Sequence, residues 1–303
     1  RRDSNIVTRF INGQIHSLAK TNLDAPGAFD IAFSTAGTAA VNASGAVLAD
    51  FTLTGAGSVG GKNRAIFFAP STRGPLDLVL QTGDLLSTLS GGLPANAKAT
   101  ALTVQISQQA RRGVFQTTIS GTGITTSNNL LLMMDNGVGV SLLHRTGQAI
   151  NGLSNATAAK FVEVLQSHDR DLITVSYQLK TSTTPVVTTS NDTGLLLLDH
   201  AGAIGANLAA REGASATAFA GSGTFGQFTG RAAAGQGSTI HFGALFTPTI
   251  GPSVTGIFRM TTDGVTKATT AAVGSPAPGA GANFASFPSL SSIGSDALFK
   301  ATL

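Results

Sequence analysis

The sequence has no cysteine, no tryptophan and only one tyrosine, and it has few charged residues. Without cysteine there is neither a disulfide framework nor a thiolate metal site. Charged residues make up 11% of the 303 residues, whereas about 25% is usual for a soluble domain. The hydrophobic share of 42% is nevertheless too high for an intrinsically disordered chain. The composition therefore predicts a folded protein with little charge on its surface.

Long apolar runs and clustered charge are also missing. The longest apolar clusters, Leu130–Met134 and Leu195–Leu198, are far shorter than the ~18 residues of a membrane helix. The net charge is only +4, and lysine and arginine are scattered along the chain. The electrostatic pattern of a nucleic-acid-binding protein is therefore absent. We predict no transmembrane segment and no nucleic-acid partner.

The start of the chain suggests where the protein works. It begins at Arg1, and Asp3–Ser17 lacks the apolar core of a signal peptide. A simple explanation is a trimmed chain. Low charge, abundant small polar residues and only two glutamates, Glu163 and Glu212, favour another: a mature chain whose leader was removed. We expect an extracellular, cell-surface or periplasmic location.

A repeated pattern is present along the whole chain. Short hydrophobic runs recur with starts about sixty residues apart, on the order of a long propeller-blade period. They are Ile6–Phe10, Ala65–Phe68, Leu130–Met134, Leu195–Leu198 and Gly256–Met260. Each is followed by a turn dipeptide such as Asn136-Gly137, a type that fits a tight hairpin with positive φ at both central residues. A hydrophobic strand and its turn in each unit therefore predict a β-hairpin.

A related tetrapeptide follows the second strand of each hairpin. Four copies carry glycine at the third position, as in Gln81-Thr82-Gly83-Asp84. The first copy reads Lys20-Thr21-Asn22-Leu23, and asparagine is the residue that best replaces glycine in the left-handed region. A small-residue loop and a second hairpin come next; in the first unit its strands are predicted as Phe29–Phe33 and Gly45–Leu53. Ala206–Arg211 is the best helical stretch, but the repeat makes it a strand.

Five units of four strands predict an all-β fold of the β-propeller class. The chain starts and stops inside a unit, and neither terminal half is stable as a lone hairpin. We therefore expect the N-terminal hairpin to pair with the C-terminal one and close the ring. The alternatives are an open β-solenoid or two β-sandwiches. The prediction is one domain, 1–303, with blades near 28–82, 100–146, 158–212, 222–273, and 284–303 plus 5–22.

Several segments resemble a known bacterial family. Pro276-Ala277-Pro278-Gly279 after Gly274, Asn42-Ala43-Ser44-Gly45-Ala46 and Ser291-Ser292-Ile293-Gly294 followed by Ala297-Leu298-Phe299 resemble motifs of the choice-of-anchor tandem repeat proteins. That family is named for its Asn-x-x-Gly-x-x-Ala-Phe repeat. The resemblance implies a secreted or surface-attached protein of unassigned activity. Its motif is structural and transfers no catalytic residue.

The longer connections of the repeat all fall at one end of the predicted blades. Binding residues usually lie on loops held by a rigid scaffold, so this end is the candidate binding surface. The side chains chosen there are Lys62, Asn63, Asp84, Asn151, Asn155 and Lys160. Alternatively, such residues only satisfy loop backbone.

The residues give little support for catalysis. The five histidines show no metal-ligand spacing, so we predict no metal and no cofactor. Asp30 and Glu163 are predicted on the innermost strands of the first and third units. Two carboxylates in a propeller channel could cleave a glycosidic bond if their separation fits. A glycan-active hydrolase is therefore the alternative function.

The favoured function is non-enzymatic. We expect an extracellular or cell-surface scaffold, or a module that binds proteins or surface glycans through its long loops. Low charge and extensive sheet surface also suit assembly into a larger complex or filament.

Overall fold

The computed structural model describes residues 5–11, 14–28, 30–42, 45–70, 76–89, 92–107, 113–150, 153, 155–166, 172–199, 204–234, 239–261, 266–293 and 296–303. The chain forms two compact units, Arg1–Thr146 and Gly147–Leu303. Helix is limited to one turn of 3-10 helix, Ala56–Ser58, and one of α-helix, α1 (Thr217–Ala220), among these residues. The predicted all-β class is confirmed.

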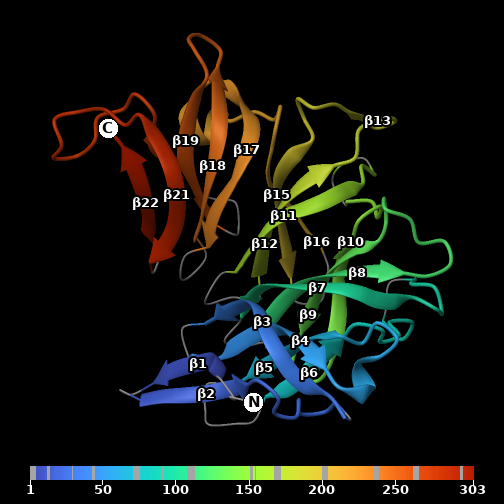
Figure 1. The fold of residues 1–303 in the computed structure, drawn as a ribbon. Helices are drawn as coiled ribbons and strands as arrows, with labels where there is room; N and C mark the ends of the chain where they lie inside the picture. The colour runs from blue at the N-terminus through green and yellow to red at the C-terminus, as the bar shows by residue number, and fades with distance from the viewer. Residues whose placement is uncertain are drawn as a thin grey trace. The chain divides into compact units, whose positions relative to one another are not determined.

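The first unit contains a hairpin and two four-stranded sheets (Figure 1). The hairpin pairs β1 (Asn5–Ile11) with β2 (Gln14–Lys20). Sheet 1 consists of β3 (Ala32–Val41), β4 (Val47–Thr54), β5 (Arg64–Ala69) and β6 (Asp77–Gln81). Sheet 2 consists of β7 (Lys98–Ser107), β8 (Gly113–Ser120), β9 (Leu130–Asp135) and β10 (Val140–Arg145).

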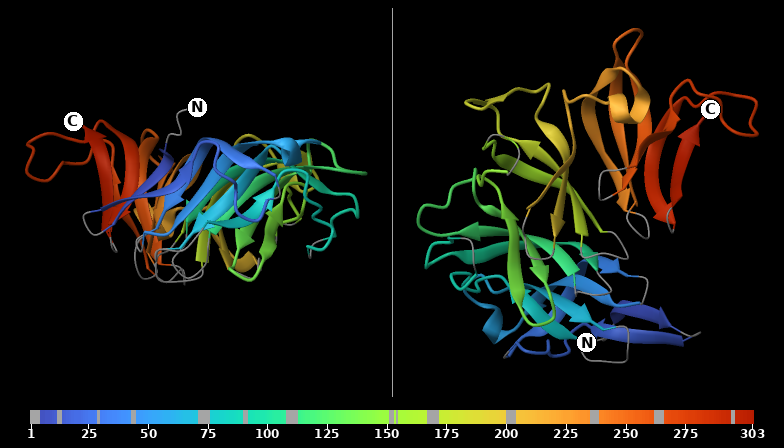
Figure 2. Two further views of the ribbon diagram at one scale, coloured as in Figure 1. Left: turned by 60° about the horizontal axis from the view of Figure 1, so that its bottom comes forward. Right: turned by 180° about the vertical axis from the view of Figure 1, so that it is seen from behind.

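The second unit contains two further four-stranded sheets and a hairpin (Figure 2). Sheet 3 consists of β11 (Ala158–Gln166), β12 (Leu172–Leu179), β15 (Thr193–Asp199) and β16 (Ile204–Arg211), with β13 (Ser182–Thr183) and β14 (Val186–Val187) in one loop. Sheet 4 consists of β17 (Gly223–Ala234), β18 (Thr239–Pro248), β19 (Val254–Thr261) and β20 (Lys267–Ala272). The hairpin pairs β21 (Ser286–Ile293) with β22 (Asp296–Thr302).

Each of the four sheets is an antiparallel meander in which neighbours in sequence are neighbours in space. The two middle strands of each sheet are the most deeply buried, as β4 from Val47 to Phe51 and β9 from Leu131 to Asp135 show. Neighbouring sheets within a unit share an apolar core: Leu48 and Ile66 of sheet 1 pack with Leu102 and Phe115 of sheet 2. In the second unit Leu195 and Leu197 of sheet 3 pack against a cluster of phenylalanines in sheet 4. These large buried faces explain the low charge content.

The sheets are linked by a recurring hydrogen-bonded turn that we call the crossover. Asn22 follows β2 with φ +63, and its amide donates to the carbonyl of Phe33 at 2.9 Å. Four glycines do the same at the ends of β6, β10, β16 and β20, with φ between +78 and +87. Their amides donate as follows: Gly83 to Ala99, Gly147 to Ala158, Gly213 to Phe225, and Gly274 to Phe284. The prediction that Asn22 replaces glycine at this turn is confirmed.

Some local expectations are corrected. Ala206–Arg211 is a strand, as predicted. The first strand of sheet 1 is not Phe29–Phe33, because β3 begins only at Ala32. The loop at Asn136-Gly137 is not a two-residue turn: the amide of Asn136 donates to the carbonyl of Gly139 at 3.1 Å, which makes a four-residue loop. Only Gly137 of this pair has positive φ.

Candidate binding surface

Within each sheet, the long connections lie at the same end. This follows from the meander order. In an antiparallel meander, the loop between strands 2 and 3 lies at the same end as the crossovers before strand 1 and after strand 4. We call this the long-loop end of a sheet. Its second-to-third-strand loops are residues 55–63, 121–129, 180–192 and 249–253. This is the arrangement predicted for the binding surface, and it holds within each sheet.

Three of these loops are held at their far end by the same side-chain contact. Gln81 Nε2 donates to the carbonyl of Lys62 at 2.9 Å in sheet 1. Arg145 Nε donates to that of Asn128 at 2.6 Å in sheet 2. Arg211 Nε donates to that of Asn191 at 2.9 Å in sheet 3. In sheets 1, 2 and 3 the last residue of strand 4 thus fixes the loop in place, although these three side chains were not predicted as site residues.

Two of the loops carry the same four residues, Thr-Thr-Ser-Asn, which our sequence interpretation did not use. They occupy 125–128 and 188–191. The amide of Thr125 donates to Asn128 Oδ1 at 2.7 Å, and that of Thr188 donates to Asn191 Oδ1 at 2.8 Å. Because the tetrapeptide is identical in both copies, a search for short repeats would have found it.

The predicted residues of sheet 1 lie at its long-loop end. Lys62 and Asn63 are exposed at the end of the 55–63 loop, and the carbonyl of Asn63 accepts the amide of Leu53 at 2.8 Å. Asp84 Oδ2 accepts the amide of Gln81 at 2.9 Å, so this carboxylate stabilises the crossover. The three residues are brought to one end of the sheet, and Asp84 has a structural partner there.

The predicted carboxylate Asp30 is not on a strand. It lies in the turn before β3 with φ +54, its side chain is exposed, and its carbonyl accepts the amide of Gly57 at 3.1 Å. The expectation of an inner-strand carboxylate is therefore wrong for Asp30, since tight loop geometry moves it off the strand. Glu163 is on β11, opposite Ser176, but its side chain lies outside the described residues.

The remaining predicted residues belong to the second unit. Asn155 is exposed with φ +67 in the crossover before β11. Lys160 is exposed on β11, opposite Gln178. Asn151 lies outside the described residues. Asn155 and Lys160 are therefore both accessible at the long-loop end of sheet 3.

The acidic residues at this end of sheet 3 are buried and engaged. Glu212 Oε2 accepts the Thr193 hydroxyl at 2.8 Å, and the same hydroxyl oxygen accepts the amide of Phe228 in sheet 4 at 3.2 Å. Asp192 Oδ2 accepts Gln178 Nε2 at 2.9 Å. Both carboxylates serve packing within the unit, so they add little negative charge to its surface.

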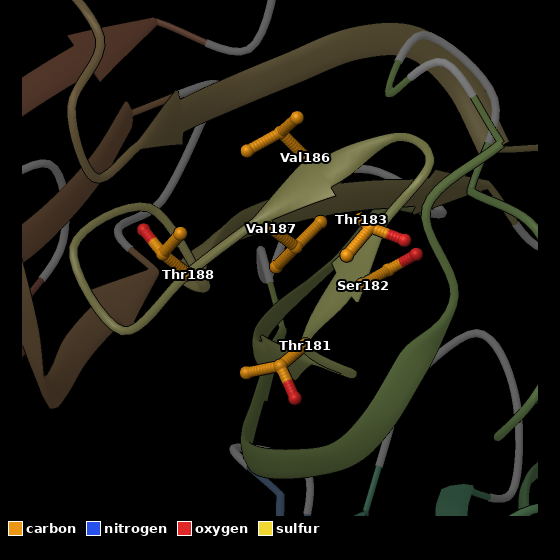
Figure 3. Close-up of a pocket in the computed structure, with 6 residues that line it drawn as sticks. All are labelled: Thr181, Ser182, Thr183, Val186, Val187 and Thr188. Atoms are coloured by element: carbon orange, nitrogen blue, oxygen red, sulfur yellow. The ribbon is translucent and has the colours of Figure 1, made fainter.

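A shallow depression lies in the longest of these loops (Figure 3). It is formed around the small β13–β14 hairpin. Hydroxyl-bearing and aliphatic side chains line it: Thr181, Ser182, Thr183, Val186, Val187 and Thr188. Ser182 is committed to the local backbone, because its hydroxyl donates to the carbonyl of Thr184 at 3.1 Å. This hairpin was not predicted from the sequence.

The described part of the chain shows no cluster of three or more histidine, cysteine or acidic side chains placed to hold a metal ion. Nor does it contain a helix with the length and apolar character needed to cross a membrane. Burial raises the pKa of Tyr177 above its ordinary value of 10, while Arg211 nearby acts in the opposite direction. This phenol is a buried packing element rather than a base.

The fold defines an all-β protein built from small antiparallel sheets, three of which have a long loop fixed by a side chain from strand 4. The chain belongs to DUF7453, a family of unknown function, whose match covers residues 2–296. Comparison with curated proteins gave no match.

Proposed function

We propose that the two terminal hairpins pair to complete a fifth sheet, so that the protein is a five-bladed β-propeller made of tandem repeats. The crossovers support this proposal. The β1–β2 hairpin is followed by the Asn22 crossover, as β5–β6 is followed by the Gly83 crossover. It therefore corresponds to strands 3 and 4 of a sheet.

The C-terminal hairpin supplies the missing half. It is preceded by the Gly274 crossover, as β7–β8 is preceded by the Gly83 crossover, and so corresponds to strands 1 and 2. The proposed sheet has the order β21-β22-β1-β2. Closure in this way pairs the free edges of β22 and β1, and unpaired strand edges otherwise invite aggregation.

The proposed function is that of a non-enzymatic, extracellular or cell-surface scaffold or binding module that contacts proteins or glycans through its long-loop ends. One observation carries it: the loops of sheets 1, 2 and 3 are fixed by Gln81, Arg145 and Arg211. Meanwhile their tips are exposed, as at residues 125–127 and 188–190. A fixed loop loses little conformational entropy when it binds.

Location outside the cytoplasm rests on composition and on the resemblance to choice-of-anchor repeat proteins. The absence of cysteine and the low charge content are compatible with a role at the cell surface, and neither indicates which partner is bound. No observation favours the hydrolase, because the inner-strand placement of Asp30 on which it depended is lost.

The function is tested by incubating the chain with insoluble cell-wall polysaccharides and with purified surface proteins. We expect retention on at least one of them, without release of reducing ends. A loop variant with Thr125, Thr126, Thr188 and Thr189 changed to alanine should be retained less. Release of reducing ends by the unaltered protein would contradict the non-enzymatic assignment, and retention unaffected by the loop variant would contradict the use of these loops.

A further inference from the structure

The long-loop end of sheet 3 differs from the others in its loop. Residues 180–192 form the longest of the four second-to-third-strand loops, and only this loop, among those described, contains its own two-stranded sheet. The hairpin places Thr183 opposite Val186, and both residues line the depression. The extra residues therefore form a surface feature that the fold itself does not require.

Lys180 directly precedes Thr181, the first residue lining this depression, and Lys160 lies on the neighbouring strand β11. Lys160 is opposite Gln178 of β12, and Lys180 comes two residues after Gln178, directly beyond the end of this strand. The amide of Lys180 donates to the carbonyl of Thr157 at 2.9 Å, so the two segments remain paired to this point, past an irregularity in register between Ala158 and Lys160. Side chains in such a diagonal relation are about 7–8 Å apart. Both ammonium groups can therefore reach one ligand.

The two lysines place positive charge on the surface of this unit, in which the side chain of Glu163, also on β11, lies outside the described residues. Both lysines are exposed, and neither has an ion pair among those residues. The acids at this end, Asp192 and Glu212, are 4% and 7% exposed and accept hydrogen bonds from other groups. At the long-loop end of sheet 1, by contrast, Lys62 is accompanied by the exposed Asp30 and the half-buried Asp84. The long-loop end of sheet 3 is therefore better suited to bind an anion than that of sheet 1.

The apolar part of the depression narrows the ligand class. No phenylalanine or tyrosine is among the exposed large hydrophobic side chains of the described residues, whereas Val186 is 66% exposed. The depression therefore lacks the aromatic rings on which the bases of single-stranded nucleic acids stack. It also lacks the aromatic anchors of strong protein interfaces. An acidic sugar carries hydroxyls, C–H faces and a negative group. These match the hydroxyls of Thr181 and Thr183, the valine methyls and the two ammonium groups.

We propose that Lys160, Lys180 and the Thr181–Thr188 hairpin form a binding subsite for an anionic polysaccharide, with the lysines on its carboxylate or sulfate groups. The inference rests on the proposed binding function and names its ligand class. The negative groups bind the lysines, while Thr181 and Thr183 hydrogen-bond sugar hydroxyls over the methyls of Val186.

Binding of fluorescently labelled polygalacturonate, dextran sulfate and neutral dextran to the full chain tests this subsite at about 0.15 M salt. We expect the Lys160→Ala/Lys180→Ala double variant to bind the preferred polyanion at least tenfold more weakly. The control Lys98→Ala/Arg259→Ala removes the same charge from two exposed positions elsewhere and should retain affinity within about twofold. The ratio of polygalacturonate to dextran sulfate affinity distinguishes carboxylate from sulfate recognition.

A second variant tests the hairpin without changing charge. Thr183→Val keeps the side-chain shape and removes one hydroxyl, so we expect affinity to fall about threefold. Equal losses in the lysine variant and its control, or no polyanion binding at all, would overturn the subsite. Binding of neutral dextran or of a protein through the loops, unaffected by Lys160 and Lys180, would overturn it while leaving the proposed function intact. Cleavage of a polysaccharide would instead count against the proposed function.

Discussion

The backbone amide of Asn22 donates to the carbonyl of Phe33 at 2.9 Å, and Asn22 holds a left-handed φ of +63 to do so. The same contact joins Gly83 to Ala99 at 2.7 Å at the next crossover. One backbone device thus starts sheet 1 and sheet 2, although the residue that provides it differs.

The first prediction concerns this crossover. Asn22→Gly should leave stability unchanged within about 0.5 kcal/mol, because glycine adopts this conformation without steric cost. Asn22→Val should lower the free energy of unfolding by about 1–2 kcal/mol, because a β-branched residue is strained at positive φ. Urea unfolding of both variants measures the difference. Equal stability of the glycine and valine variants would contradict the role of the turn.

The second prediction concerns the bulge of β3. A Cβ on Gly37 would collide with the carboxylate of Asp50, which is 1% exposed and accepts the amide of Thr38 and the guanidinium of Arg64. Gly37→Ala should therefore destabilise the protein by roughly 2 kcal/mol. Gly139→Ala is the matched control, since nothing lies within 4 Å of its added Cβ. If thermal unfolding gave equal midpoints for the two variants, the close approach would be unimportant.

These examples show what the sequence predicts and what it does not. The strand period, the meander order and the Asn22 turn follow from local patterns that recur along the chain. The predicted strand position of Asp30 was wrong, because a tight loop shifts the start of β3. The hydrophobic pattern of the sequence does not show this shift. The β13–β14 hairpin was missed for a related reason: Thr181–Thr188 is polar loop composition, and its pairing depends on neighbouring backbone rather than on periodicity.

The third prediction concerns the loop clasp. Arg211→Ala removes the donor to the carbonyl of Asn191 and should speed hydrogen exchange of the 188–192 amides while costing about 1 kcal/mol. Arg211→Gln should preserve most of the protection, because Gln81 makes the equivalent contact to Lys62. The alanine and glutamine variants are compared by mass spectrometry. Equal exchange in both would show that this contact does not fix the loop.

The fourth prediction concerns acid stability. Burial lowers the pKa of His144 from 6.5 to about 4, so the folded protein holds this histidine neutral. The unfolded chain takes up a proton below pH 6.5, and stability is lost as the pH falls from there to about 4. The loss reaches roughly 3 kcal/mol. His144→Gln should reduce the drop in unfolding free energy between pH 7 and pH 4; an unchanged drop would assign it to other groups.

The fifth prediction uses the single tyrosine. Because burial raises the pKa of Tyr177 above 10, the folded protein should show almost no tyrosinate absorbance at pH 10.5. An exposed tyrosine is roughly three-quarters ionised there. The folded state loses stability as the pH rises past 10, since only the unfolded chain ionises. Addition of urea at pH 10.5 should reveal the full signal, and tyrosinate in the folded sample would place Tyr177 at the surface.

The proposed fifth sheet requires the free edge of β22 to pair with β1. The carbonyl of Thr302 accepts the amide of Ala285, so Thr302 faces β21, and the backbone groups of its neighbour Ala301 face away, as do those of Phe299. In a lone hairpin these two amides are open to water. In a closed ring they donate to β1.

Hydrogen exchange of the Phe299 and Ala301 amides, measured by NMR in a sample shown to be monomeric, tests the propeller. Closure predicts protection comparable to that of Ala49 and Phe51 in β4, which correspond to them in register. Exchange at the rate of an unprotected chain, with β4 still protected, would contradict the closed five-bladed ring.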